Sequence, residues 1–272
     1  MSTPPLPQDG PDPAPELSVV VPVRDEGPNI LPLIAEIRAR LAGLDCEIVY
    51  VDDASTDATP ARLAEAAALN GAPLRRLRHR DGRGQSAALL TGIRAARGEW
   101  IATLDGDGQN DPADIPALLD RARAEAARSA LPVLIAGHRV ARRDSAWRRF
   151  TSRIANAVRA RLLRDGTPDS GCGLKVFRRD DFLDLPRFDH MHRFLPALFR
   201  RAGGRVISLP VAHRPRHAGR SKYGTWGRLG AGIVDLMGVA WLQRRWRPPE
   251  LDTARDGAAG GAVGAPPRGG GE

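Results

Sequence analysis

Short apolar runs alternate along this chain with segments of helical periodicity, and this alternation constrains the fold more than any other feature. Strands are predicted over the short, largely apolar runs Leu17–Val23, Cys46–Val51, Trp100–Leu104 and Leu131–Ala136, with Leu74–Leu77 as a candidate short strand. Helices are predicted between them over Pro28–Leu41, Thr59–Leu69, Ser86–Ala96 and Pro112–Ala127. Repeated units of this kind predict an α/β fold, with a mainly parallel sheet and helices on both faces.

The two ends differ in composition from the rest of the chain. Residues 1–16 are rich in proline and acidic, and residues 248–272 are rich in Gly, Ala and Pro. We therefore expect a disordered leader over 1–16, a folded domain over 17–224, an amphipathic interfacial helix over 225–247 and a disordered tail over 248–272. Only Cys46 and Cys172 are present, which excludes a disulfide scaffold and favours a reducing, cytoplasmic setting.

The net charge of +9 is unevenly distributed. Residues 1–16 carry −3 and residues 247–272 carry −1, so residues 17–246 carry +13. A field of this sign suits an anionic partner, such as nucleic acid, an anionic membrane or a phosphorylated substrate. An alternative is that the charge serves solubility alone, because 39 of the 41 basic residues are arginine.

Acidic clusters follow three of the predicted strands, at the edge of a parallel sheet where ligands bind. They are Arg24-Asp25-Glu26, Asp52 to Asp57, and Asp105-Gly106-Asp107-Gly108-Gln109. Carboxylates gathered at one edge repel one another unless a cation compensates them, and Mg²⁺ typically takes one or two protein carboxylates plus phosphate oxygens. A single cluster would be interpreted as a solvated acidic turn, but three at successive strand ends favour a metal site.

A glycine-containing stretch, residues 81–86, leads into the helix predicted from Ser86. Its backbone N–H groups could face an anion at the start of that helix, or it is an ordinary loop with a helix cap. The stretch matches neither the phosphate loop of nucleotide triphosphatases nor the dinucleotide-binding fingerprint. The sequence therefore does not support either of these two protein classes.

Six segments together resemble family 2 of the glycosyltransferases, which has the GT-A fold, and more narrowly the polyprenyl-phosphate glycosyltransferases typified by dolichol-phosphate mannose synthase. The resemblance covers about Leu17 to Trp246. The segments are Val21–Glu26, Val51–Asp57, Gly84–Gly92, Asp105–Pro112, Ser170–Gly173 and Arg216–Tyr223. Their order and spacing, rather than any one of them, make the resemblance specific.

The resemblance implies a role for individual residues. Donor binding would fall to Pro22, Arg24, Glu26, Asp52, Asp53, Ser55, Gln85 and Asp105. The metal, Mg²⁺ or Mn²⁺, would be held by Asp105, Asp107 and Gln109. The acceptor phosphate would face Arg139, Arg153, Ser170, Arg216, Ser221 and Lys222, and the catalytic set would be Asp107, Arg139, Arg216 and Lys222. The first motif departs from the family pattern at Arg24 and Asp25, which leaves the nucleotide base open.

The activity that the resemblance implies is inverting transfer of a sugar to dolichyl or undecaprenyl phosphate, by default of mannose from GDP-mannose. A UDP-linked donor is the alternative, with a polyprenyl phosphate or a saccharide acceptor in cell-envelope glycan synthesis. A saccharide acceptor would need a carboxylate base, and residues 185–195 offer only Asp189. A nucleic-acid-binding protein is a distant alternative, but stacking aromatics and zinc patterns are missing, so we expect no nucleic-acid partner.

Two segments indicate contact with an anionic membrane surface. In the first, Trp147, Phe150, Ile154, Val158 and Leu162 share one helical face flanked by arginines. In the second, the apolar run Leu229–Leu242 is too short to span a bilayer. Each could instead pack against the folded domain. We expect a peripheral protein at the cytoplasmic face, with a membrane-protein partner or a second copy of the chain as open alternatives.

Lysine occurs at only two positions, Lys175 and Lys222. A lysine ammonium is a compact charge suited to a phosphate oxygen, so we interpret Lys222 as a phosphate contact. Lys175 lies on a further predicted strand, and we expect it to be structural. Cys172, between two glycines, is predicted to be a small buried residue rather than a nucleophile.

Overall fold

The computed structural model describes residues 13–69, 72–140, 159, 161–215 and 225–245, with side chains from residue 232 onward in the last range. The strands are β1 (Leu17–Val23), β2 (Cys46–Asp52), β3 (Leu74–Arg78), β4 (Trp100–Thr103), β5 (Val133–Arg139), β6 (Lys175–Arg178) and β7 (Arg205–Val211). The helices are α1 (Gly27–Arg40), α2 (Thr59–Ala67), α3 (Gln85–Ala95), α4 (Ile115–Arg128), α6 (Arg179–Leu183), α7 (Leu195–Arg201) and α8 (Thr225–Arg245). Two short 3₁₀ turns, Pro112–Asp114 and Met191–Arg193, precede α4 and α7.

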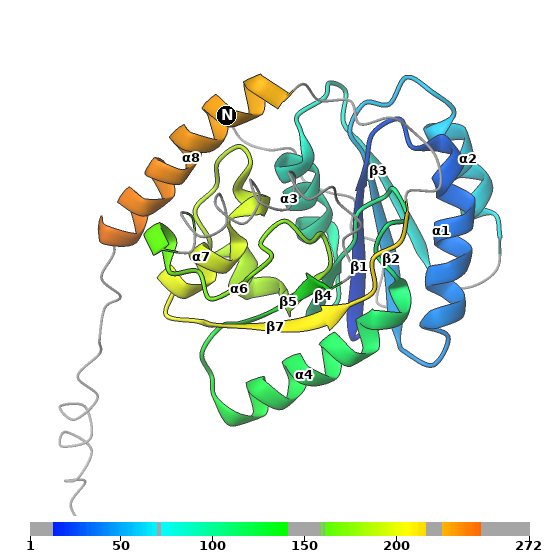
Figure 1. Cartoon of the computed structure of the whole chain (residues 1–272). Coiled ribbons are helices and arrows are strands. Elements are labelled where there is room, and N and C mark those ends of the chain that lie inside the picture. The colour runs from blue at the N-terminus through cyan, green and yellow to red at the C-terminus, as the bar shows by residue number, and fades with distance from the viewer. Residues whose placement is uncertain (1–12, 70–71, 141–158, 160, 216–224, 246–272) are drawn as a thin grey trace, which may run out of the picture.

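The described strands form one seven-stranded sheet in the order β3-β2-β1-β4-β6-β5-β7 (Figure 1). Neighbouring strands are parallel except at β6, which runs antiparallel to both β4 and β5. The prediction of a mainly parallel sheet is therefore confirmed. The sheet edge formed by β7 was not among the predicted strands; its apolar residues in Arg205–Val211 are interrupted by Ser208 and Pro210.

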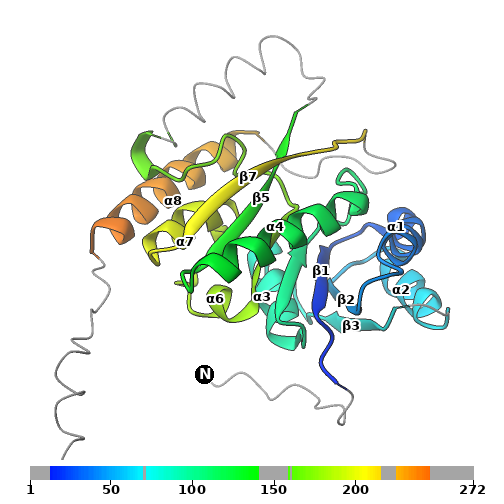
Figure 2. The same ribbon diagram turned by 90° about the horizontal axis from the view of Figure 1, so that it is seen from below.

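Helices cover both faces of the sheet, as the alternation of strands and helices predicted. One apolar cluster joins β1 and β2 to buried residues of α1, α2 and α4, and the other joins the opposite face to α3, α6, α7 and α8. Helix α8 lies against α7, at the far side of the molecule from α1 and α2 (Figures 1 and 2). Between these two layers lie the carboxyl ends of the parallel strands, where ligands of such sheets bind.

The observed bounds differ from the predicted ones mainly at element ends. Strand β5 begins at Val133 rather than Leu131, which is 52% exposed. The helix predicted from Pro112 begins with a 3₁₀ turn before α4, and α2 ends at Ala67. Within the described parts of the chain, no helix combines the length and apolar character needed to cross a bilayer.

Several predicted segments fall outside the described residues. These are most of the disordered leader, the tail from 248 onward, and the helix predicted around Trp147, whose described part starts at Arg159. The predicted site residues Arg153, Arg216, Ser221 and Lys222 also fall outside the described residues.

Candidate active site

The loop after β4 holds the two carboxylates of the third acidic cluster. Asp105 Oδ1 accepts a hydrogen bond of 2.9 Å from Gln85 Nε2, at the first residue of α3. The backbone of Gly173 lies against the Asp105 carboxylate, so closely that a Cβ at position 173 would overlap it. Gly106 packs against the side chain of Val23 of β1. Strand, helix and loop thus fix Asp105 from three sides.

The two carboxylates of this loop repel each other. Burial raises the pKa of Asp105, and the neighbouring charge of Asp107 raises it further, while Lys175 and Arg139 oppose the shift. A raised carboxyl pKa means that the charged form is held at a cost, which a bound cation would relieve. Two carboxylates match the one or two protein ligands that Mg²⁺ or Mn²⁺ takes beside substrate phosphates. In the part of the chain that the structure describes, no group of three or more His, Cys, Asp or Glu side chains is arranged to hold a metal.

Gln109, the third predicted metal ligand, is oriented toward the segment after β7. Its backbone N–H donates to Asp107 Oδ1 at 3.1 Å, and its side-chain Nε2 donates to the carbonyl of Arg214 at 3.5 Å. Gln109 therefore braces the loop in this structure, and its role as a ligand stays a prediction.

Asp53 organises the glycine-containing stretch that precedes α3. Its carboxylate accepts hydrogen bonds from the backbone N–H of Arg83 at 2.7 Å and of Gly84 at 2.8 Å, and from His79 Nδ1 at 2.8 Å. Burial raises the pKa of Asp53, but these hydrogen bonds outweigh it and hold the pKa below its usual value. Gly84 adopts the positive φ of 85° that favours glycine. The carboxylate of Asp53 therefore holds the backbone of Arg83 and Gly84 in place.

The turns after β1 and β2 are joined by polar contacts. Asp52 Oδ1 accepts from the backbone of Ser55 at 2.8 Å, and Ser55 Oγ accepts from the backbone of Asp25 at 2.8 Å. Asp25, in the left-handed region with φ of 51°, accepts in turn from the backbone of Thr56 at 2.7 Å. The Arg24 side chain lies against Gly82 of the stretch before α3. The structure thus gathers at one sheet edge the predicted donor-binding residues Pro22, Arg24, Glu26, Asp52, Asp53, Ser55, Gln85 and Asp105.

Two residues predicted to face the acceptor phosphate are held by internal partners. Arg139, at the end of β5, donates from Nε and Nη2 to both carboxylate oxygens of Asp169, at 2.7 and 2.8 Å. These hydrogen bonds raise the pKa of Arg139. Ser170 Oγ accepts from Arg159 Nη1 at 2.5 Å. Arg139 lies close enough to Asp105 to affect its pKa, and the contact of Arg139 and Ser170 with a phosphate stays a prediction.

Lys175, for which the sequence indicated a structural role, lies close enough to Asp105 to affect its pKa. It is 4% exposed on β6, beside Thr103 of β4, and its Nζ donates to the carbonyl of Cys172. Burial lowers the pKa of Lys175, while Asp105 acts in the opposite direction. The rarity of lysine in this chain was the signal that could have singled it out. Cys172 is fully buried, as predicted, and burial raises the pKa of its thiol.

A serine–histidine pair near the start of α3 was also absent from the sequence-based set. Ser86 Oγ lies 2.7 Å from His192 Nδ1 and accepts from the His192 backbone N–H at 3.2 Å. Burial lowers the pKa of His192 to about 3, so its ring is neutral at pH 7. The pair ties the turn before α7 to the helix that carries Gln85.

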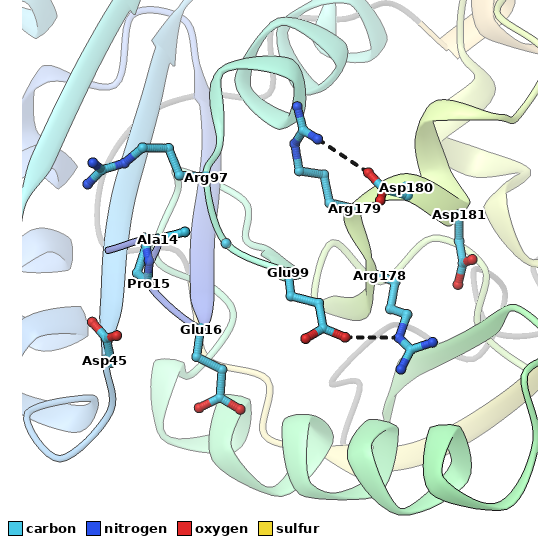
Figure 3. Close-up of a pocket in the computed structure, with 11 residues that line it drawn as sticks. Ala14, Pro15, Glu16, Asp45, Arg97, Glu99, Arg178, Arg179, Asp180 and Asp181 are labelled. Carbon is cyan, nitrogen blue, oxygen red and sulfur yellow. Dashed lines mark hydrogen bonds and ion pairs between the residues drawn. The ribbon is translucent and has the colours of Figure 1, made fainter. Parts of the chain in front are cut away.

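A hollow of about 770 Å³ lies at the opposite edge of the sheet (Figure 3). It is lined by residues that precede β1, β2 and β4 and by the end of β6. Ion pairs cross its wall between Arg178 and Glu99 at 3.2 Å and between Arg179 and Asp180 at 3.3 Å. The acidic pair Asp105 and Asp107 lies at the other end of these strands, where ligands of parallel sheets bind.

Comparison with known proteins identifies the family of the chain. The model of the family described as glycosyl transferase family 2 matches residues 18–185. A dodecaprenyl-phosphate galacturonate synthase of Rhizobium johnstonii is 36% identical over 234 residues, which cover 84% of this chain and 68% of the relative. An undecaprenyl-phosphate 4-deoxy-4-formamido-L-arabinose transferase of Pseudomonas paraeruginosa is 34% identical over 223 residues, which cover 81% of this chain and 64% of the relative. The chain thus spans about two thirds of the length of these relatives.

Two solved structures share the fold. Glucosyl-3-phosphoglycerate synthase of Mycobacterium tuberculosis, in complex with Mn²⁺, UDP and its product, has a TM-score of 0.58 and 19% identity, covering 84% of this chain and 80% of that one. A mannosyltransferase of Pyrobaculum calidifontis, in complex with GDP-mannose and Mn²⁺, has a TM-score of 0.56 and 23% identity, covering 88% and 68%. The predicted GT-A fold is confirmed, and the chain belongs to glycosyl transferase family 2.

Proposed function

We propose that this chain transfers a sugar from a nucleotide-diphosphate donor to a polyprenyl phosphate with the help of a divalent cation. The observation that carries the proposal is the pair Asp105 and Asp107 at the open sheet edge, with Lys175 and Arg139 close enough to affect the pKa of Asp105. The acidic side chains would bind the metal ion, and the neighbouring basic side chains would bind phosphate oxygens. A reaction between a metal–diphosphate and an anionic acceptor needs both kinds of group. The names of both curated relatives, which contain dodecaprenyl and undecaprenyl phosphate, support the acceptor class.

The reaction does not need a strong general base from the protein. A phosphate monoester is already an anion near neutral pH, so its oxygen attacks the anomeric carbon directly. A bond forms between that oxygen and the anomeric carbon, the bond from the carbon to the donor diphosphate breaks, and the configuration inverts. Asp105 and Asp107 would hold Mg²⁺ or Mn²⁺, which when bound neutralises charge on the leaving diphosphate. Arg139, Arg216 and Lys222 would position the acceptor phosphate.

The identity of the transferred sugar is a more specific part of the proposal than the class of acceptor. The motifs favour mannose from GDP-mannose, whereas the two curated relatives are named for galacturonate and for 4-deoxy-4-formamido-L-arabinose. The motif departure at Arg24 and Asp25 lies on the donor edge, where the base would bind. We therefore keep GDP-mannose and UDP-linked sugars as the two competing donors.

A donor panel tests the function. The full chain is incubated with undecaprenyl or dolichyl phosphate in detergent, Mn²⁺ or Mg²⁺, and radiolabelled GDP-mannose, UDP-glucose or UDP-galacturonate. We expect one donor to give label in the lipid extract, and chelation of the metal to abolish it. In parallel reactions with a saccharide in place of the lipid, label on the saccharide but never in the lipid would refute the proposed acceptor. A separate measurement of DNA binding at moderate salt tests the nucleic-acid alternative, which DNA binding without any sugar transfer would favour.

Helix α8 carries the proposed membrane contact. One of its faces is docked on the domain: Val239 and Ala240 are buried, and Gln243 Nε2 donates to the carbonyl of Leu163 at 2.9 Å. Its other face exposes large apolar side chains, namely Ile233, Val234, Met237 and Trp241 at 56, 71, 61 and 57%. The guanidinium of Arg245 lies 5.8 Å from the centre of the Trp241 ring. An exposed apolar face that ends in arginines fits an anionic headgroup layer, so we place the protein peripherally at the cytoplasmic face.

Serine substitution at Met237 and Trp241 together is expected to weaken binding to vesicles that contain phosphatidylglycerol by about tenfold or more, because two large apolar side chains leave the interface. Co-sedimentation measures the effect. The matched control is Leu69→Ser, which removes a 57% exposed apolar side chain just after α2, a helix on the far side of the molecule from α8. Equal loss in the control, or unchanged binding of the double variant, would contradict a bilayer contact; dimers lost in the double variant would instead assign the face to a second copy of the chain.

A further inference from the structure

The segment that follows β7 runs directly beside the metal loop, defined here as residues 105–114. His213 forms an antiparallel bridge with Asn110. The backbone N–H of Arg214 donates to the carbonyl of Gln109 at 2.9 Å, and that of Ala212 donates to Asp114 Oδ2 at 2.8 Å. Backbone contacts at three positions therefore hold the two segments together, although about a hundred residues separate them in the chain.

Arg214 adds a charged clamp to this contact. Its Nη1 and Nη2 donate to the two carboxylate oxygens of Glu36 on α1, at 2.9 and 2.7 Å. Its Nη2 also pairs with Asp111, four residues after Asp107. The three side chains are 20 to 25% exposed, so water screens the clamp only in part. One guanidinium thus compensates two carboxylates at the border of the site.

We propose that Arg214 is a positioning residue: by clamping Asp111 and Glu36 it fixes the metal loop in the geometry that receives the metal and the donor diphosphate. The proposal rests on the proposed function for the identity of that ligand. Without Arg214, the metal loop would lose the side-chain link that runs from Asp111 through Arg214 to Glu36 of α1. Asp111 and Glu36 would also lose a compensating positive charge at the border of the site, which makes the approach of a diphosphate less favourable. Both effects weaken the metal–diphosphate site without removing any of its ligands.

The other end of β7 supplies a matched comparison. Arg205, at the first residue of the strand, pairs with the buried carboxylate of Glu125 on α4 at 2.6 Å. Arg205 and Arg214 thus tie the two ends of one strand to neighbouring helices through the same type of ion pair. Only Arg214 touches the metal loop. Removing Arg205 tests the structural contribution, and removing Arg214 tests the structural contribution together with the positioning role.

The experiment uses the full chain and measures binding of Mn²⁺ with UDP, and of Mn²⁺ with GDP, by calorimetry without any acceptor. For Arg214→Gln we expect binding of the preferred pair to weaken about tenfold, which corresponds to about 1.4 kcal/mol. For Arg205→Gln we expect binding to stay within about twofold of the wild type, with only a modest fall in Tm, because Glu125 keeps its pairs with Arg121 at 2.9 Å and Arg128 at 3.4 Å. Arg214→Lys keeps the charge without the planar fork and should restore part of the loss.

Unchanged affinity in Arg214→Gln, or an equal loss in Arg205→Gln, would overturn the proposal. If Arg214→Gln does not fold, Glu36→Gln serves in its place, because it removes the tether to α1 while Asp111 keeps its pair; unchanged affinity there also overturns the proposal. A wild-type chain that binds Mn²⁺ with a nucleoside diphosphate but moves no sugar refutes the proposed function and leaves the positioning role measurable. A wild-type chain that binds neither overturns both.

Discussion

Asp107→Asn is expected to lower sugar transfer by about 10³-fold or more while the protein stays folded. The neutral amide removes one of the two negative charges that would hold the metal against the donor diphosphate. Transfer is measured as radiolabel in the lipid extract at saturating metal. Asp120→Asn is the control: Asp120 is 71% exposed on α4 and pairs with Arg123 at 2.7 Å, so its loss should leave transfer unchanged.

The stability of the same variant separates a metal site from a structural carboxylate. In the folded protein the charge of Asp107 raises the pKa of Asp105, so the two carboxylates repel each other at pH 7. Removing one of them should hold or raise the Tm in the absence of metal. Added Mn²⁺ should raise the Tm of the wild type and have little effect on Asp107→Asn, because only a site that binds in the folded state stabilises it. Metal-dependent transfer that survives in Asp107→Asn would refute the assignment.

The acidic edge was predictable because its signal is local. The runs Leu17–Val23, Cys46–Val51 and Trp100–Leu104 each end in acidic residues, and parallel strands must bring such ends together. The structure extends β2 by one residue and shortens β4 by one, and it keeps the acidic residues at the shared edge. Local periodicity and the direction of parallel strands suffice for this part of the site.

Long-range pairing could not be predicted, because one sequence does not show which charge meets which. Arg214 and Glu36 are separated by 178 positions, and either could have chosen among many opposite charges. The same limit affects Arg139, which the motifs assigned to a phosphate and which the structure pairs with Asp169. Strand β7 was not predicted because its short apolar stretches, interrupted by Ser208 and Pro210, carry a weaker signal than a continuous apolar run. Tertiary partners, rather than local propensity, decide these positions.

Asp53→Asn is expected to destabilise the protein by about 2–4 kcal/mol, because Asp53 is 4% exposed and its two oxygens accept three hydrogen bonds. An asparagine side chain keeps one oxygen and turns an N–H₂ group toward a backbone N–H that can only donate. The free energy of unfolding in urea measures the loss. Asp81→Asn is the control in the same stretch, since the Asp81 side chain is 75% exposed and its pair with Arg83 is long, at 3.5 Å.

The pH dependence of that loss has a definite sign. The pKa of Asp53 is lowered in the folded protein, so the stability that Asp53 contributes is present above its ordinary pKa of about 4. It is lost as the pH falls through the lowered value, where the folded carboxylate takes up a proton. The gap in unfolding free energy between wild type and Asp53→Asn should therefore be full at pH 7 and narrow in acid below about pH 4. A gap that stays constant into acid would mean that the hydrogen bonds do not depend on the charge.

The same substitution connects stability to donor binding. Asp53 holds the backbone of Arg83 and Gly84, and the next residue, Gln85, donates to Asp105. Loosening the stretch should therefore raise the KM for the donor about tenfold, while the KM for the lipid phosphate stays nearly unchanged, because Arg139 and Ser170 are held by Asp169 and Arg159 on the other side of the site. An equal rise in both constants would show that Asp53→Asn disturbs the whole sheet edge, and would leave Gln85 without a separate role in fixing Asp105.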